Sequence, residues 1–528
     1  MAATRAIRRG KILQVGLDRE DGSPLYRQVY QNIRSSILNG RLGPGTRLPS
    51  TRHLAGDLGV ARSTVVQAFE QLRAEGYIQA FRGAATCVRR SLPDAHVRSA
   101  PATTAATQSR REARISERAQ RMLRSPHRSV WTVGRPPRAF RAGVPAVDVF
   151  PVDTWGRILA RRWARTSSRH LAYADPFGYQ PLRDAVAEYL RAARGVRCSP
   201  EQVLIVSGSQ QAIDLSARVL LDPGDTVWLE DPGYHGARGA MAGAGAIVAP
   251  IPVDENGLIV SEGRKRAPHA KLAFVTPSRQ LPLGSTMSLE RRLELIAWAA
   301  DRAWILEDDY DSEFRYATKP LAALQGLDDS GCVLYTGTFS KVMFPSLRLG
   351  YMVVPEPLIE AFAAARHFSD YHSAYIDQAA MTDFMVDGHF ERHIRRMRAI
   401  YQERQGILIE AARRELSPYL RIEPADAGMT LIAWLNGLDD VDVSKAAAEA
   451  GVDVLALRPF TIEQPIPPGI LLGYSGVAER DIQSGVTQLA TVLRDLEPDA
   501  GSRRNGYVRN GDAKSILQRA RSDRLTRP

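Results

Sequence analysis

Five short apolar runs divide the middle of this chain, and each pair of neighbouring runs leaves room for a helix between them. The runs lie at residues 203–206, 226–229, 271–275, 303–306 and 333–335. Continuous apolar runs of this length are typical of strands that are buried on both faces, and parallel strands need a crossover that is usually a helix. The pattern therefore predicts an α/β domain with a mostly parallel sheet over residues 138–497.

A different pattern precedes this domain and predicts three helices followed by a hairpin. The predicted helices cover residues 24–38, a segment with Ser50 as its N-cap, and a segment from Ser63 or Thr64 to about Ala74. Residues 76–79 and 86–89 flank a glycine turn and are expected to pair as strands. Helix, helix, turn, helix and hairpin make a winged helix-turn-helix.

The chain has 528 residues and a net charge of +12. Its charge distribution and composition indicate four regions. We expect a winged helix-turn-helix in residues 1–92, a flexible basic linker in 93–137, the α/β domain in 138–497 and a basic, disordered tail in 498–528. The first, second and fourth regions are basic and the third is acidic. A basic front favours a polyanionic partner such as nucleic acid, although it also serves solubility.

The predicted recognition helix begins with side chains that suit base edges in double-stranded DNA. Arginine and glutamine make paired hydrogen bonds to guanine and adenine, and small hydroxyls reach phosphate or bases. The candidate base readers are Arg62, Ser63, Thr64 and Gln67. The candidate backbone contacts are Arg47, Ser50, Thr51 and Arg52, with Arg82 at the wing tip for the minor groove. The alternative is a small helical domain that binds protein.

The cysteines and the apolar segments indicate in which cellular compartment the protein is expected. Cys87, Cys198 and Cys332 are widely spaced, so they predict neither a disulfide framework nor a zinc site, which suits a reducing cytoplasm. The arginines near the N-terminus are not followed by the apolar stretch of a signal peptide. No stretch is long and apolar enough for a membrane span.

The segment Gly337-Thr338-Phe339-Ser340-Lys341 places a lysine at the end of a predicted buried strand, with Arg348 seven residues on. A lysine there is desolvated, which depresses its pKa and frees its amine to attack an aldehyde. Two hydroxyls and an arginine suit a phosphate group. These groups are the set needed to hold pyridoxal 5'-phosphate (PLP) as a Schiff base on Lys341.

Three further features fit the same cofactor. Ser209 and Gln210 open a helix after the first apolar run, where free backbone N–H groups bind anions such as phosphate. Asp308 follows a strand and can pair with a pyridinium nitrogen, and Tyr310 can bond the phenolic oxygen of the ring. The alternative for the four carboxylates of residues 307–311 is an acidic surface loop or a divalent-cation site.

These motifs carry two resemblances. Residues 48–55, 60–65 and 72–78 resemble the GntR family of bacterial regulators, and residues 138–497 resemble the fold-type I aminotransferases. The second resemblance implies that Tyr234 packs on the cofactor ring and that Tyr173 reaches the cofactor phosphate of a partner subunit. Both halves together resemble the MocR subfamily, in which a winged helix is fused to an aminotransferase-like domain.

The MocR resemblance implies a transcriptional regulator in the bacterial cytoplasm that is associated with the nucleoid. It implies a domain-swapped homodimer that senses an amine or a B6 vitamer through aldimine exchange at Lys341. Two alternatives are an active aminotransferase with an accessory DNA-binding domain and a DNA-binding protein with an inactive scaffold. The identity of the effector, the target genes and the sign of control are not predicted.

The chain departs from the family pattern at three positions near the expected site. Arg279 stands where the family usually has histidine, and Leu281 stands where aminotransferases have an asparagine before a proline. Residues 469–475 lack the arginine that transaminases use to bind a substrate carboxylate. Arg458 is the nearest candidate for that role, as an effector-binding residue. Such a site is expected to bind amines and to turn over poorly.

Overall fold

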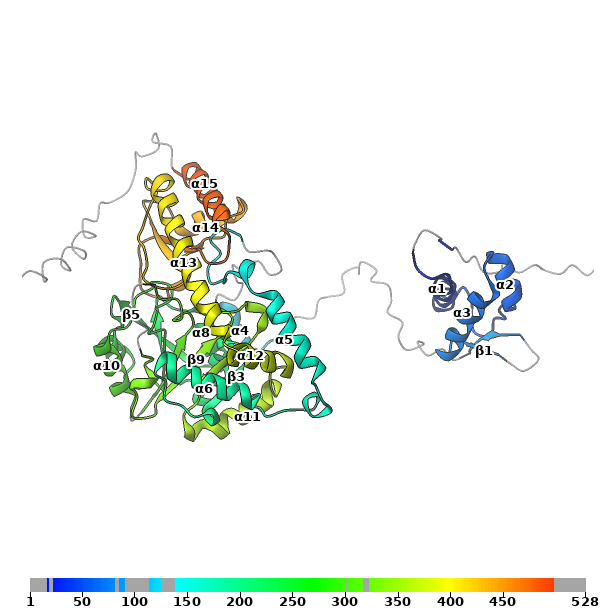
Figure 1. Cartoon of the computed structure of the whole chain (residues 1–528), viewed down its shortest axis with the longest axis horizontal. Helices are drawn as coiled ribbons and strands as arrows, with labels where there is room; N and C mark the ends of the chain where they lie inside the picture. Colours follow the sequence, from blue (N-terminus) through cyan, green and yellow to red (C-terminus); the bar gives the residue numbers. More distant parts are fainter. Residues whose placement is uncertain are drawn as a thin grey trace, which may run out of the picture. The chain divides into compact units, whose positions relative to one another are not determined.

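The computed structural model describes residues 17–18, 22–80, 85–90, 114–125, 138–300, 302–316 and 322–497. The chain divides into two compact units, residues 1–113 and residues 114–528, which we describe separately (Figure 1). None of the helices within the described ranges is both long and apolar enough to span a membrane.

The first unit is a three-helix domain with a short hairpin. Its elements are α1 (Leu25–Leu38), α2 (Thr51–Leu58), α3 (Arg62–Ala74), β1 (Ile78–Gln79) and β2 (Cys87–Val88). The predicted apolar stripe is confirmed in α1, because Val29, Ile33 and Ile37 are buried in the core with Val65 and Leu72 of α3. The order of elements is that of a winged helix-turn-helix.

Local signals in the sequence set the ends of these helices. The Ser50 hydroxyl accepts a hydrogen bond from the backbone N–H of His53 at 3.2 Å, as predicted for an N-cap. Gly59 ends α2 with a φ of 62°, a left-handed conformation that glycine adopts without strain. The hairpin pairs Ile78 with Val88. The predicted wing-tip residue Arg82 lies outside the described residues.

The second unit is built on an eight-stranded sheet with the order β3-β10-β9-β8-β7-β4-β5-β6. Strands β4, β5, β7, β8 and β9 are parallel, whereas β10 is antiparallel to both of its neighbours, so the sheet is mixed and mostly parallel, as predicted. The bounds are β3 Val203–Val206, β4 Thr226–Asp231, β5 Ile247–Asp254, β6 Gly257–Leu258, β7 Leu272–Val275, β8 Trp304–Asp309, β9 Val333–Thr338 and β10 Gly350–Val353.

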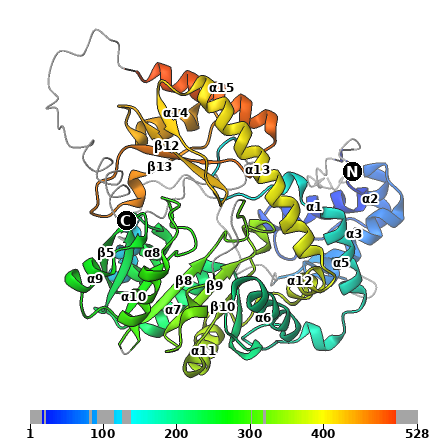
Figure 2. The same ribbon diagram turned by 60° about the vertical axis from the view of Figure 1, so that its left-hand side comes forward.

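Helices cover both faces of this sheet, and Figure 2 shows β8, β9 and β10 side by side among them. Two clusters of buried apolar side chains lie on its opposite faces, one around Leu204 and Phe274 and one around Trp228 and Trp298. The helices are α5 Val152–Ala164, α6 Gln180–Arg194, α7 Ser209–Leu220, α8 His235–Ala244, α9 Val260–Arg266, α10 Leu289–Ala299, α11 Ile359–Asp370 and α12 Tyr375–Val386.

A small lobe, defined here as residues 416–497, packs at one end of the large sheet. The long helix α13 (His389–Glu415) leads into it and packs against its last helix, as Figures 1 and 2 show. Its elements are β11 Leu420–Ile422, β12 Thr430–Leu435, α14 Asp440–Glu449, β13 Leu455–Ala456, β14 Gly469–Gly473 and α15 Glu479–Asp495. The four strands form a second sheet with the order β11-β12-β14-β13.

The predicted linker, residues 93–137, contains a helix that belongs to the second unit. Helix α4 (Glu117–Arg124) packs against α8. Arg121 donates a hydrogen bond to the carbonyl of Gly245 at 3.3 Å, and Met122 lies against Gly243. Residues 114–125 therefore belong to the second unit. The predicted tail, residues 498–528, lies outside the described residues.

Candidate cofactor site and nucleic-acid interface

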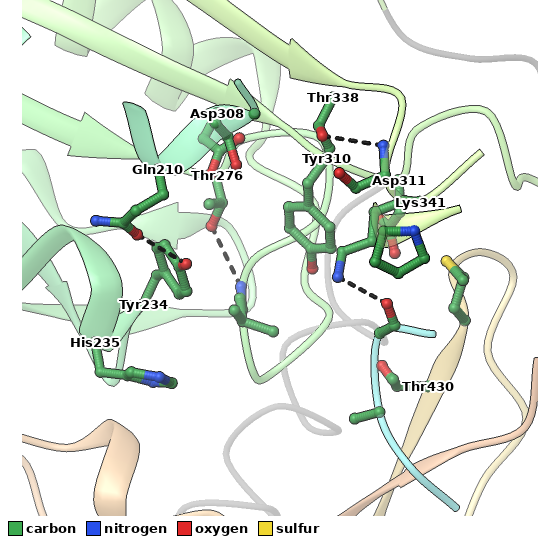
Figure 3. Close-up of a pocket in the computed structure, with 18 of the residues that line it drawn as sticks. Gln210, Tyr234, His235, Thr276, Asp308, Tyr310, Asp311, Thr338, Lys341 and Thr430 are labelled. Carbon is green, nitrogen blue, oxygen red and sulfur yellow. Dashed lines mark hydrogen bonds between the residues drawn. The ribbon is translucent and has the colours of Figure 1, made fainter. Parts of the chain in front are cut away.

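A cavity of about 410 Å³ opens at the carboxyl ends of β8 and β9 and at the start of α7 (Figure 3). Ligands of open α/β sheets bind at this edge, because strand ends and helix N-termini converge there. The large lobe contributes most of the wall, and the small lobe contributes Met429, Thr430, Leu455, Phe460 and Leu471.

Lys341 stands at this cavity, three residues after the end of β9. Its Nζ donates a hydrogen bond to the carbonyl oxygen of Gly143 at 2.7 Å. Burial lowers the pKa of the Lys341 ammonium, although the carboxylates of Asp311 and Asp308 oppose this effect. The amine is therefore more easily freed of its proton than a surface lysine, as a nucleophile requires.

Successive side chains of a strand point to opposite faces, so the neighbouring carboxylates at the end of β8 lie in different surroundings. Asp308 lines the cavity, whereas Glu307 accepts hydrogen bonds from the backbone N–H groups of Leu324 and Gln325 on another side of the strand. Asp309 pairs with Arg194 at 2.7 Å. Among the residues that the structure describes, no group of His, Cys, Asp or Glu side chains is arranged to hold a metal ion.

Asp308 and Tyr310 each keep a buried polar atom without a partner. Asp308 Oδ1 and the Tyr310 hydroxyl make no hydrogen bond within the described part of the chain. Burial and the neighbouring Asp309 raise the pKa of Asp308 to about 7. Buried polar groups are rarely left unpaired, so both atoms indicate a ligand with a donor for one and an acceptor for the other. A protonated pyridine ring with a phenolic oxygen offers both.

The opposite wall presents an aromatic ring. Tyr234 precedes α8, and its hydroxyl donates to Gln210 Oε1 at 3.0 Å. Burial and the Asp308 carboxylate raise the pKa of Tyr234 to about 12, so its hydroxyl stays protonated at neutral pH. Gly236 lies so close that a Cβ at this position would be 2.4 Å from Gln210 Oε1. The arrangement suits a flat ring stacked on Tyr234.

The start of α7 and Arg348 form a site for an anion. Gly208 precedes the helix with a φ of 111°, and a Cβ built on it would lie 3.4 Å from Arg348 Nη1. No side chain among the described residues caps the backbone N–H groups at the start of α7. The Ser340 hydroxyl is buried without a partner within the described ranges, and Thr338 Oγ1 accepts the N–H of Ser340 at 3.1 Å. Free donors and a guanidinium suit a phosphate dianion.

The cavity brings together most of the site residues that the sequence predicts. The predicted residues that line it are Ser209, Gln210, Tyr234, Asp308, Tyr310, Thr338, Lys341 and Arg348. Tyr173 is not among the lining residues and is 85% exposed. Arg458 does not line the cavity either, because its guanidinium is paired with Asp439 and Asp440.

Several lining residues were missed by the sequence reasoning. Ala142 and Gly143 reach the cavity from the segment before α5, and Thr430 and Phe460 reach it from the small lobe. No spacing in the sequence links these segments to Lys341, since they lie far from it along the chain. Leu281, which stands where aminotransferases have an asparagine, lies in the wall and makes it apolar. Leu471, from the segment 469–475 that lacks the expected arginine, does the same.

The stability of the cofactor-free protein is expected to fall as the pH rises from about 4 to about 7. Burial raises the pKa of Glu230, Glu307, Asp308 and Glu313 to about 7. Folding then favours their neutral forms, so this stability is present below the unfolded pKa of about 4 and is lost as the pH approaches 7. Asp309 acts in the opposite sense: burial raises its pKa, but the charge of Arg194 and the hydrogen bonds from Arg194 and Tyr335 together outweigh burial and hold this pKa below the ordinary value.

Thermal melting of the cofactor-free protein at several pH values tests this expectation. Asp308→Asn is expected to flatten the slope, because the amide replaces one carboxyl that must lose a proton in the folded state. A melting temperature that rises from about pH 4 to about pH 7 would contradict the expected sign.

Most of the predicted DNA-contacting side chains of the first unit are exposed. They lie on α3 and in residues 47–52. Arg62, Ser63 and Gln67 of α3 are exposed and Thr64 is half-buried, while Val65 and Phe69 turn into the core. Arg47, Ser50 and Arg52 are exposed, and Thr51 is half-buried. The polar start of α3 is thus free to enter a major groove while its apolar face holds the domain together.

Comparison with known proteins follows the same division of the chain. Residues 25–88 match the family of bacterial regulatory proteins called the gntR family, and residues 145–479 match the family aminotransferase class I and II. The probable rhizopine catabolism regulatory protein MocR of Rhizobium meliloti is 41% identical over 486 residues, which cover 91% of this chain and 96% of that protein. The pyridoxine biosynthesis transcriptional regulator PdxR of Corynebacterium glutamicum is 29% identical over 91% of this chain and 98% of its own length.

Solved structures resemble the second unit. The kynurenine aminotransferase of Pyrococcus horikoshii, in complex with PMP, has a TM-score of 0.63 at 27% identity and covers 74% of this chain and 98% of its own. LysN, the alpha-aminoadipate aminotransferase of Thermus thermophilus, complexed with N-(5'-phosphopyridoxyl)-L-leucine, has a TM-score of 0.65 at 28% identity and covers 72% and 97%. Both of these structures hold a pyridoxyl phosphate group in this fold.

Proposed function

Because this chain belongs to the MocR-type transcriptional regulators of the GntR family, we propose that its aminotransferase-like domain senses an amine or a B6 vitamer and that its winged helix reports the result to DNA. The relatives that match over nearly the whole chain are named as regulators of rhizopine catabolism and of pyridoxine biosynthesis. The chain thus acts through double-stranded DNA, and the small-molecule signal is the part that we infer.

The cofactor of the domain is PLP, and the residues present fit it. The unpartnered Asp308 Oδ1 suits the protonated ring nitrogen, and the unpartnered Tyr310 hydroxyl suits the phenolic oxygen. Ser209, Thr338 and Arg348 lie where they can hold the phosphate. When bound, PLP supplies an aldehyde that links reversibly to a primary amine.

Sensing then depends on what the residues of this chain do around that aldehyde. Lys341 supplies the resident amine, and burial keeps its pKa low enough for the amine to be released and taken up again. An effector amine that enters the cavity competes with Lys341 for the same position. The wall beyond Lys341 is apolar at Leu281, Leu455 and Leu471, and these side chains offer no clamp for a substrate carboxylate. Such a site favours binding over repeated turnover.

One observation carries the proposal most directly: where the cofactor ring and phosphate are expected, the cavity of Lys341 is lined by three buried polar groups that have no hydrogen-bond partner among the described residues. They are Asp308 Oδ1, the Tyr310 hydroxyl and the Ser340 hydroxyl. Left permanently unpaired, each would cost on the order of 1–3 kcal/mol of folding free energy. A site that keeps them is best explained by a ligand that satisfies all three.

An absorption spectrum of the purified protein tests the proposal. We expect a visible band of bound cofactor that borohydride fixes onto Lys341, and a shift of this band with an effector amine. The amine from a panel that shifts the band at the lowest concentration identifies the effector. A colourless protein that PLP cannot reconstitute would refute the sensing role and would leave only the DNA-binding unit. Repeated turnover with a 2-oxo acid would favour the aminotransferase alternative.

We also propose a homodimer, because the second unit has an exposed aromatic patch on its surface. Tyr173 and Phe368 are 85% and 81% exposed, and the ring of Tyr173 lies 5.1 Å from that of Tyr371. Leu171 adds another exposed apolar side chain next to Tyr173. Exposed apolar patches of this kind mark interfaces. We infer that a second copy covers the patch and that Tyr173 reaches the partner's cofactor phosphate.

Phe368→Asp is expected to shift the protein from a dimer towards a monomer, because it places a charge in the patch. Sedimentation velocity measures the change, with Leu289→Asp as a control at an exposed apolar residue on the first turn of α10. A wild-type protein that sediments as a monomer at all concentrations would contradict the inferred dimer.

A further inference from the structure

A buried ion pair beside Lys341 has no part in the function proposed above. Asp311 follows β8, lines the cavity and is 2% exposed. Its Oδ2 lies 3.5 Å from Nη1 of Arg279, which belongs to the loop after β7 and is also buried. The other oxygen, Asp311 Oδ1, has no hydrogen-bond partner in the part of the chain that the structure describes.

Arg279 joins this carboxylate to the small lobe. Its Nη2 donates to the carbonyl oxygen of Thr430 at 2.7 Å, and its Nη1 donates to Thr430 Oγ1 at 3.3 Å. The guanidinium also lies against Gly428, where a Cβ would be 2.2 Å from its central carbon. Thr430 begins β12, so one arginine contacts the aspartate of the large lobe and the first strand residue of the small lobe.

Asp311 is also the carboxylate that acts most strongly on Lys341. Burial lowers the pKa of the lysine, and Asp311 opposes this effect more than Asp308 does. Both Asp311 and Lys341 line the cavity, and Figure 3 shows them on the same side of it. The amine itself donates to Gly143, so the free oxygen of Asp311 is not used in this state.

Other charged groups around the pair do not provide a substitute for Asp311. Asp308 faces the expected cofactor ring, and Asp309 is paired with Arg194. Arg315 and Arg279 act on Asp311 as cations, and Glu230 acts on Asp308 from the end of β4. Asp311 thus has a free carboxylate oxygen in the cavity that is not assigned to the cofactor ring.

Displacement of Lys341 by an amine changes the charge in the cavity. The effector brings a second basic nitrogen into a buried space that still contains the nitrogen of Lys341. A second positive charge there is costly unless an anion accompanies it. A carboxylate that already has one oxygen fixed by an arginine can accept the released ammonium with its other oxygen without reorganisation.

We propose that Asp311, oriented by Arg279, receives the ammonium group of Lys341 when an amine takes its place, and that Arg279 transmits this event to the small lobe through Thr430. The proposal rests on the sensing function described above. It assigns Asp311 and Arg279 as positioning residues and makes the contact between Arg279 and Thr430 the place where the two lobes respond to the amine.

The first test titrates the cofactor-loaded protein with methylamine and follows the visible band. Asp311→Asn keeps the shape of the side chain and removes its charge. We expect the half-saturating concentration of methylamine to rise about tenfold, which corresponds to a pKa effect of about one unit. The midpoint of the band in a pH titration without amine is expected to fall, because a cation at Lys341 loses a neighbouring anion. Asp311→Glu keeps the charge and is expected to stay closer to the wild type.

The second test follows hydrogen exchange of the backbone amides of residues 428–435 with and without methylamine. In the wild type we expect methylamine to change their protection. Arg279→Met is expected to remove this response, and Arg279→Lys, which keeps the charge, is expected to restore part of it. Asp148→Asn serves as a control, because Asp148 is in a similar ion pair with the buried Arg404 at 2.6 Å and neither residue lines the cavity.

The outcomes separate this inference from the proposed function. A wild type that never forms a visible band refutes both. A band that forms and shifts with methylamine equally in the wild type and in Asp311→Asn overturns the inference and leaves the sensing function intact. If Asp311→Asn gives no melting transition, the comparison of Arg279→Lys with Arg279→Met decides, and equal responses of these two variants overturn the inference.

Discussion

Lys341→Ala is expected to abolish the response of DNA binding to the effector while leaving the affinity for DNA without effector unchanged. In the proposed sensing mechanism, the lysine supplies the amine that the effector displaces. Its side chain lies in the second unit, whereas the candidate DNA contacts lie in the first. Without this amine, the effector has no lysine to displace from the cofactor. Binding of the effector then causes no change that the DNA-binding unit could respond to. Electrophoretic mobility shift with and without the effector amine measures both quantities.

The control for this variant is Lys445→Ala, which removes an exposed lysine of α14 away from the cavity. It is expected to keep the visible band, the borohydride labelling and the effector response. A Lys341→Ala protein that still responds to the effector at wild-type concentrations would show that the signal does not pass through this lysine.

Replacement of the exposed start of α3 is expected to have the second large effect. Arg62→Ala and Gln67→Ala each remove a side chain suited to paired hydrogen bonds with one base, worth about 1–3 kcal/mol of discrimination. The affinity for the specific site should therefore fall about tenfold or more for each variant, and the preference at one base pair should relax. Fluorescence anisotropy with the native operator and with single base-pair variants measures both effects.

Arg73→Ala is the matched control, since this exposed arginine lies in the last turn of the same helix. This substitution removes one positive charge from the domain, as Arg62→Ala does, but it leaves the start of the helix unchanged. Arg47→Ala should differ from both groups, because a backbone contact weakens binding to all sequences alike and lowers the salt dependence. Equal losses for Arg62→Ala and Arg73→Ala would refute the assignment of α3 as the reading helix.

The sequence predicts the two folds because both are encoded by local signals. The stripe of α1, the N-cap Ser50 and the glycine after α2 each act within a few residues of the chain. The five apolar runs of the large domain all became strands of one sheet. Strand β5 was not anticipated, since Pro250 and Pro252 interrupt its apolar pattern, and the antiparallel β10 could not be distinguished from its neighbours by composition.

The candidate site was predictable where it follows the ends of strands and not where it comes from tertiary packing. Asp308, Lys341 and Arg348 lie in or directly after elements with clear patterns, so their convergence could be expected. The approach of Gly143 to Lys341 depends on how the segment before α5 packs on the small lobe, which no local pattern encodes. Arg458 was a candidate by proximity in sequence, but two adjacent aspartates at the start of α14 hold it outside the cavity.

The contact between α4 and α8 has a practical consequence for work with the isolated second unit. Helix α8 contains Gly236, Gly239 and Gly243, and each glycine in a helix interior costs roughly 1 kcal/mol relative to alanine. Its order thus depends on its neighbours, and α4 is one of them. A recombinant fragment that starts at residue 138 would lose this contact, which lies at Gly243 and Gly245, at the end of the helix that follows Tyr234. A fragment that starts at residue 114 keeps it and is the better choice for crystallisation and ligand screening.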